Sequence, residues 1–296
     1  MIRQISRLAI VFIGVAASLF TILETIHHFH KPASPDGRIG LYILGAYALF
    51  FFLYAVVSSR KGGYAEALQH LHLPYHFCLS SVLNTQGTQT ESEIRTVGEK
   101  ICNQIASAFS IITGTVCSVC IKIIDQMPED ITKENPNLSV STWCRDDTST
   151  TERHHKTEIT NWLNRNTDFI RIFRNLDSPQ KRIFFCNNLP WLPSYINTSF
   201  EIHGEPKNSI IPGGIARMIW GWPLLYRSTI VAAIYPIKPL PEDRLAGYLC
   251  VDSPLPWVFR KRFDGKIMND IAAGLYPLVT KWLLMVSEQK GGNHAL

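Results

Sequence analysis

Two long apolar runs near the start of the chain constrain its architecture most. Residues 39–57 form a run of nineteen residues without a charged side chain. At about 1.5 Å of rise per residue, a helix of this length spans roughly 28 Å, close to the thickness of a bilayer's hydrocarbon core. Residues 8–26 form a second run, interrupted only by Glu24 near its end. Because a backbone in lipid must satisfy its own hydrogen bonds, each run is expected to be a helix. The sequence predicts a two-transmembrane-helix hairpin in residues 1–61.

The basic residues around the two runs indicate an orientation. Arg3 and Arg7 precede the first run, Arg60 and Lys61 follow the second, and the loop between them holds one lysine and one arginine. This bias favours both ends inside the cell and the loop outside. The first run lacks a small-x-small cleavage site at its end, so we do not expect a signal peptide. The expected location is a bacterial inner membrane, with a multi-pass anchor and the soluble part in the cytoplasm.

Small residues recur on one side of the first run. Gly14 and Ser18 lie four residues apart, and so do Ala17 and Thr21. Small residues at this spacing let two helix backbones approach closely in lipid. Two interpretations stay open: a contact with the second helix of the same chain, or self-association into a homo-oligomer within the bilayer.

The rest of the chain has the pattern of one α+β domain. A linker is expected over residues 62–85, a folded domain over 86–288, and a polar tail over 289–296. Apolar residues at three- and four-residue spacing, with Thr88 and Thr90 as candidate caps, predict a first helix. Period-two and apolar segments predict strands. The predicted helices cover residues 94–112, 158–173 and 264–286, and the predicted strands cover 115–125, 138–144, 181–186, 227–237 and 245–253.

The last third of the chain resembles a GAF domain, a small-molecule sensor fold. The segments that carry the likeness are GWPLLYRSTI at 221–230, YPI at 235–237, AGYLCVDS at 246–253 and WVF at 257–259, followed by the final helix. The resemblance implies an antiparallel sheet with helices packed on one face. It also implies a ligand pocket between the other face and the long connection before the strand that begins Arg-Ser. The fold class is therefore membrane-anchored α+β, with the hairpin followed by a GAF-like domain.

That connection, residues 187–226, is rich in aromatic side chains. One interpretation is a lid that stacks a planar ligand, and the other is that the rings fill the core beneath a long loop. The cyclic-nucleotide signature of GAF domains and the Cys-His pair that attaches bilins are both absent, so the ligand and any cofactor are unknown. The candidate pocket residues are Trp191, Tyr195, Trp220, Trp222, Tyr226 and Arg227.

Candidate metal and catalytic residues are better explained as structural. Cys117 and Cys120 have the spacing of a zinc or redox pair, but positions three apart in a strand point to opposite faces. His70, His72, His76 and Cys78 flank Pro74, which argues against a shared helical face. His27, His28 and His30 suit a polar helix end at the membrane boundary. We therefore expect no metal site and no enzymatic activity.

By architecture, the chain resembles the two-transmembrane effectors that are paired with retron reverse transcriptases in bacterial antiviral defence. That resemblance implies that a reverse transcriptase with its RNA–DNA product keeps the effector silent, and that release lets hairpins assemble and breach the membrane. After Val286 only about ten residues follow, so the hairpin or a partner is expected to supply the output. One alternative is a sensory adaptor that passes a small-molecule signal to a separate kinase or transporter. A second alternative is a GAF-type enzyme such as a free methionine sulfoxide reductase.

Overall fold

A computed structural model describes residues 90–124, 138–149, 161–204 and 221–292, together with Phe50 and short stretches between residues 63 and 80. The chain divides into two compact units, Met1–Gln69 and His70–Leu296. In the first unit, the described residues 63–69 are helical. Apart from Phe50, both apolar runs lie outside the described residues, so the hairpin stays a prediction. Within the described part of the chain, no helix combines the length and apolar character needed to cross a membrane.

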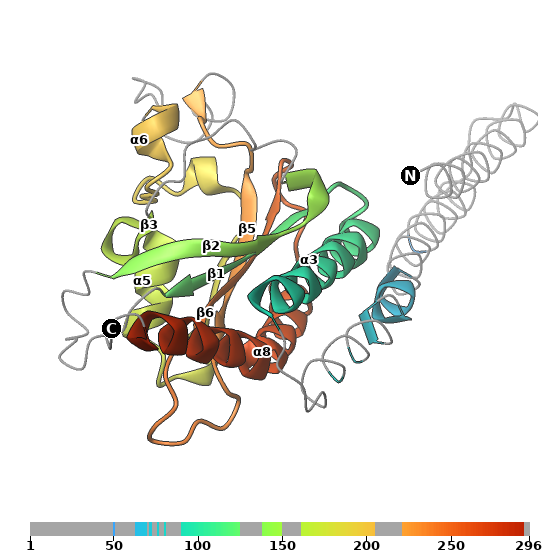
Figure 1. Ribbon diagram of the computed structural model, residues 1–296. Helices are drawn as coiled ribbons and strands as arrows, with labels where there is room; N and C mark the ends of the chain where they lie inside the picture. Colours follow the sequence, from blue (N-terminus) through green and yellow to red (C-terminus); the bar gives the residue numbers. More distant parts are fainter. Residues whose placement is uncertain are drawn as a thin grey trace, which may run out of the picture. The chain divides into compact units, whose positions relative to one another are not determined.

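The second unit is built on a six-stranded sheet with the order β3-β2-β1-β6-β5-β4, in which every neighbouring pair is antiparallel (Figure 1). The predicted antiparallel sheet is therefore confirmed. The strands are β1 (Ser118–Ile124), β2 (Ser139–Arg145), β3 (Asn161–Trp162), β4 (Ile183–Cys186), β5 (Ser228–Ile234) and β6 (Gly247–Ser253).

The helix predicted over residues 158–173 is wrong at its start. Asn161 and Trp162 form β3 and pair with β2, and a short 3-10 turn, η1 (Leu163–Arg165), follows. The helix α5 (Thr167–Arg174) begins only at Thr167. The pairing with β2 outweighs the local helical pattern here, which is a common way for tertiary context to override propensity.

The two central strands are buried along their whole length. Every residue of β5 and of β6 is buried, because both faces of the sheet are covered. Val231 and Ala233 join the core cluster on the α5 side. Since side chains alternate along a strand, Ile230 and Ala232 face the opposite side. This two-sided burial explains why these strands appear in the sequence as nearly continuous apolar runs.

One face of the sheet is covered by two long helices, α3 (Glu91–Thr113) and α8 (Asp264–Gly292), which lie together on that side (Figure 1). α3 begins with a capping box between Thr90 and Glu93, as the candidate cap predicted. Its Gly98 sits where a Cβ would come within 2.5 Å of the Cys144 Sγ atom, so glycine permits close packing on β2. α8 runs through Pro277 and continues into the first four residues of the predicted polar tail.

The other face is covered by α5 and by the connection between β4 and β5. In its described residues, 187–204 and 221–227, this connection holds the short elements η3 (Leu189–Trp191) and α6 (Phe200–His203). A further turn, η2 (Pro179–Lys181), precedes β4. Phe169 and Ile172 of α5 and Leu189 of the connection are buried against the sheet in one apolar cluster. The predicted arrangement of helices on one face and a long connection on the other is therefore present.

We expect a fragment of residues 84–292 to fold without the apolar runs. Its two faces of sheet are covered by elements that lie within this range, so its core does not need the preceding residues. Thermal or urea unfolding of the purified fragment should show one cooperative transition. A fragment that stays insoluble, or that loses secondary structure without a cooperative step, would contradict an independent domain.

The start of β6 tests how closely the sheet is packed. A Cβ at Gly247 would overlap the backbone carbonyl oxygen of Lys122 in β1. We therefore expect Gly247→Ala to lower the free energy of unfolding of the 84–292 fragment by about 2 kcal/mol or more, since backbone atoms cannot move aside cheaply. Gly265→Ala is the matched control, because its Cβ would lie 3.9 Å from the Ile183 side chain, an ordinary contact. Equal urea midpoints for the two variants would show that the strands separate easily.

Candidate functional site

The first turn of α5 is tied to the connection by reciprocal hydrogen bonds. The Thr167 backbone N–H donates to the Ile196 carbonyl oxygen at 3.0 Å, and the Ile196 N–H donates to Thr167 Oγ1 at 2.8 Å. Asn166 Nδ2 donates to Thr198 Oγ1 at 2.6 Å, and the Thr198 N–H donates to Asn166 Oδ1 at 3.2 Å. These bonds fix residues 196–198 of the connection against the start of α5.

Four polar side chains between α5 and the connection form one chain of hydrogen bonds. Tyr195 Oη donates to Asp168 Oδ2 at 3.3 Å. Asn197 Nδ2 donates to Tyr195 Oη at 3.0 Å and to Tyr226 Oη at 3.1 Å. The Ser199 backbone N–H donates to Asn197 Oδ1 at 2.8 Å and so orients the amide. We call Asp168, Tyr195, Asn197 and Tyr226 the buried polar network.

Aromatic rings from the connection pack beside this network. The Trp222 ring lies 5.6 Å from that of Phe200 and 6.2 Å from that of Tyr195, measured between ring centroids. Trp222 Nε1 donates to the Tyr226 carbonyl oxygen at 2.6 Å. The rings contact one another directly, so in this structure they serve as core packing. To bind here, a planar ligand would have to displace one of these rings and stack on the ring that remains.

Asp168 gives the site its electrostatic character. Its side chain is nearly inaccessible, and burial raises its pKa from 3.8 to about 6. A hydrogen bond from the Phe169 N–H and the charge of Lys122 act in the opposite direction. Burial together with the nearby Asp168 raises the pKa of Tyr195 and of Tyr248. The network therefore contains one carboxyl whose pKa is raised to about 6 and one phenol, that of Tyr195, which stays protonated at neutral pH.

The structure brings together only part of the predicted pocket. Tyr195, Trp222 and Tyr226 meet there, whereas Trp191 lies half exposed against the ring of Trp257, with centroids 6.1 Å apart. Arg227 takes part through its backbone, which bonds to Leu189 and Ser253. Lying outside the described residues are Trp220 and the predicted packing residues Gly14, Ala17, Ser18 and Thr21.

Asp168 and Asn197 are central to the site and were not predicted from the sequence. An acidic residue in the first turn of a helix is ordinarily a capping or dipole-stabilising residue. Asp168 occupies that position in α5, so its sequence context suggested nothing more. The one sequence feature that indicates burial of Asp168 is its position directly before Phe169, on a short helix whose apolar side chains are buried.

Burial keeps three of the described cysteines, Cys102, Cys117 and Cys144, in the thiol form. Burial raises the pKa of Cys117 to about 12 and raises those of Cys102 and Cys144 as well. Cys117 lies 3.4 Å from Thr113 Oγ1, while the thiol of Cys120 hydrogen-bonds to that of Cys250, so the two do not form a pair. Across the described ranges, no group of three His, Cys, Asp or Glu side chains could hold a metal ion.

The sequence matches no protein-family model and no curated protein. Among solved structures, a type II free methionine-R-sulfoxide reductase from Thermoplasma acidophilum is 12% identical, covering 64% of this chain and 96% of that one, with a TM-score of 0.37. The GAF domain of an Acinetobacter phosphoenolpyruvate-protein phosphotransferase is 10% identical, covering 70% and 91%, with a TM-score of 0.36. A GAF sensor protein from Burkholderia vietnamiensis is 11% identical, covering 76% and 94%, with a TM-score of 0.36.

The raised pKa of Asp168 predicts how stability depends on pH. Because the folded-state pKa lies above the unfolded value of 3.8, the carboxyl stabilises the fold below about pH 4, and that contribution is lost as the pH rises to about 6. Asp168→Asn cannot ionise. Its free energy of unfolding relative to the wild type should therefore rise by about 2 kcal/mol between pH 4 and pH 7.

Urea unfolding of the 84–292 fragment at several pH values measures this difference. Glu242→Gln is the matched control, because the Glu242 side chain is exposed in the turn between β5 and β6. A difference between Asp168→Asn and the wild type that does not change with pH would show that the carboxyl is not desolvated as described.

Proposed function

We propose that this chain is a non-enzymatic membrane effector of a bacterial antiviral defence system. In this proposal, the GAF-like domain senses a cytoplasmic cue, and the two apolar runs form the hairpin that disrupts the inner membrane. A reverse transcriptase with its RNA–DNA product is the proposed silencing partner, and a homo-oligomer is the proposed active form. The observation that carries the sensing part is the buried polar network beneath the aromatic connection.

The buried polar network has the properties of a switchable site. Asn197 bridges two phenols, and the first of these bonds to the Asp168 carboxyl. A change at any member alters the partners of the others, because buried polar groups are costly to leave unsatisfied. A small molecule or a proton that binds here therefore has a way to change how the connection packs.

One further observation supports a function without catalysis, and a second supports a membrane as the place of action. The described thiols with raised pKa values do not supply a nucleophile of the kind that cysteine enzymes use. Residues 39–57 carry no charge over a length that fits a bilayer, so a membrane is the expected place of action.

A sensory adaptor is the second candidate. The buried polar network favours it equally, because a switchable site can serve any output. In an adaptor, the anchored GAF-like domain would pass its signal to a separate kinase or transporter, and the hairpin would be an inert anchor. The two candidates differ in what the hairpin does alone.

Overproduction of the chain without its partners separates these candidates. An effector should depolarise the cell, which a potential-sensitive dye measures. The Gly14→Leu, Ser18→Leu double variant should weaken depolarisation while it still inserts, because each close helix contact in lipid contributes only about 1 kcal/mol and two larger side chains are needed to prevent it.

Ala16→Leu is the matched control, because this position lies on the opposite side of the expected helix from Gly14 and Ser18. It should depolarise cells as the wild type does. A wild-type chain that inserts while the membrane potential holds would reject the effector and leave the adaptor as the function.

A further inference from the structure

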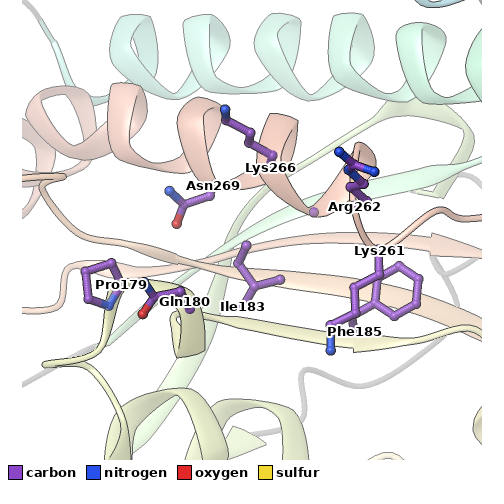
Figure 2. A pocket seen from close by; sticks show the side chains of 9 residues that line it. Pro179, Gln180, Ile183, Phe185, Lys261, Arg262, Lys266 and Asn269 are labelled. Carbon is purple, nitrogen blue, oxygen red and sulfur yellow. The ribbon is translucent and has the colours of Figure 1, made fainter.

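A groove lies between the edge strand β4 and the start of α8. It has a volume of about 320 Å³ and a mixed lining, with Ile183 and Phe185 contributed by β4 and Lys266 and Asn269 by α8 (Figure 2). None of its lining residues belongs to the buried polar network, so the groove is a separate site.

The charge of this groove has one sign. Of the nine described residues that line it, three are cations, Lys261, Arg262 and Lys266, and none is acidic. Each of the three is exposed, and Arg260 directly precedes them in the sequence. An apolar floor beneath clustered cations suits an amphipathic anion better than a simple ion, because both parts of such a ligand gain contacts.

The segment that supplies these cations also carries an exposed tryptophan, Trp257, a few residues earlier. Trp257 is 63% exposed and has a φ of 63°, a left-handed conformation that a bulky residue rarely adopts. Asn187 holds this turn, because its carbonyl oxygen accepts from the Trp257 N–H at 2.7 Å and its side chain bonds twice to the Phe259 backbone. Phe259 itself is buried, so the turn is anchored from below.

A second indole stands beside the first. Trp191 is 51% exposed, and its ring meets that of Trp257 edge to face. Trp257 lies four residues before Lys261, so the backbones of the indole turn and the groove are at most about 14 Å apart. We call residues 255–266 together with Trp191 the basic–aromatic surface. Phe263 and Leu255, which also belong to it, are half exposed.

We propose that the basic–aromatic surface docks on a bilayer that contains anionic phospholipid. Indoles favour the headgroup level of a membrane, where their rings are buried and their N–H groups stay hydrated. Lysine and arginine near an anionic leaflet each add attraction of a few-fold in affinity. The apolar floor of the groove would contact the glycerol and upper acyl region while the surrounding cations meet the phosphate. The proposal rests on the proposed membrane anchor only for the tether that keeps the surface near lipid.

Other polyanions fit the surface less well. A protein that binds a nucleic-acid strand usually has a continuous basic groove along the strand, with aromatic side chains on which successive bases stack. Here the cations are confined to one short segment, and the two indoles pack edge to face instead of offering parallel faces. The formal net charge of the whole chain is only +5, which gives little general attraction to a polyanion.

Tryptophan quenching in the full-length chain tests the docking. None of the seven tryptophans lies before residue 143, so quenching by lipid reports on the domain and not on the apolar runs. The chain is placed in nanodiscs of phosphatidylcholine with brominated acyl chains, with and without phosphatidylglycerol. We expect quenching to rise when phosphatidylglycerol is present and to fall with added salt, because surface attraction is screened.

The variants identify the surface. Trp257→Phe should remove at least half of the phosphatidylglycerol-dependent quenching. Lys261→Gln and Lys266→Gln should each lower the docking equilibrium constant by about fivefold. Lys238→Gln is the matched control with the same loss of charge, because Lys238 is exposed on the turn at the other end of β5 and β6 and should leave docking unchanged.

The outcomes separate this proposal from the proposed function. An inserted chain whose quenching ignores phosphatidylglycerol, or responds equally in the Lys238 and Lys261 variants, overturns the docking proposal and leaves the anchor intact. A chain that does not enter nanodiscs contradicts the anchor, and the same quenching is then measured with vesicles added to it. Quenching that an oligonucleotide abolishes at equal phosphate concentration would reassign the surface to nucleic acid and reject lipid.

Discussion

Burial of β5 and β6 on both faces is the constraint from which much of the domain follows. α3 and α8 cover one face, and α5 together with the chain between β4 and β5 covers the other. A connection in that position takes polar backbone and side chains out of water, and each of them needs a partner. Asn166, Thr167 and Thr198 supply partners at the point where α5 meets the connection. The buried polar network is the continuation of this requirement into the side chains.

The sequence predicts the regular parts of the domain because their local patterns and their tertiary surroundings agree. α3 has an apolar stripe, a capping box at Thr90 and a left-handed Gly114 at its end, so each local feature points to the same helix. β3 is different, because its two residues pair with β2 from a segment whose local pattern is helical. The role of Asp168 was also hidden, since an acid in a first helical turn has an ordinary explanation. Its burial depends on residues of the connection that follow it by almost thirty positions, which no local pattern reports.

The aromatic residues of the connection show why counting rings does not locate a pocket. Tyr195 and Trp222 both pack on the sheet side. The Ile196 N–H next to Tyr195 donates to Thr167 Oγ1, and the Trp222 indole N–H donates to the Tyr226 carbonyl oxygen, so each ring is held in place. Trp191 belongs to the same stretch but faces outward, where η3 turns the chain toward Trp257. Direction is set by hydrogen bonds that join residues far apart in the sequence. One aromatic-rich segment therefore contributes to two sites with different chemistry. The first is the buried polar network, which contains a carboxyl, and the second is the exposed basic–aromatic surface.

Backbone hydrogen bonds at the two ends of the connection link these two sites. The Leu189 N–H donates to the Arg227 carbonyl oxygen, and the Arg227 N–H donates to the Ser253 carbonyl oxygen, two residues before Leu255. Asn187, at the start of the connection, also holds the turn that carries Trp257. A rearrangement of the connection that moves Asn187 would therefore disturb the hydrogen bonds that keep Trp257 in its left-handed conformation. Coupling between two sites needs an element with two discrete arrangements that both sites bias. The structure shows one arrangement of the turn at Trp257, whose left-handed backbone is strained and is held by the hydrogen bonds of Asn187, the residue that begins the connection.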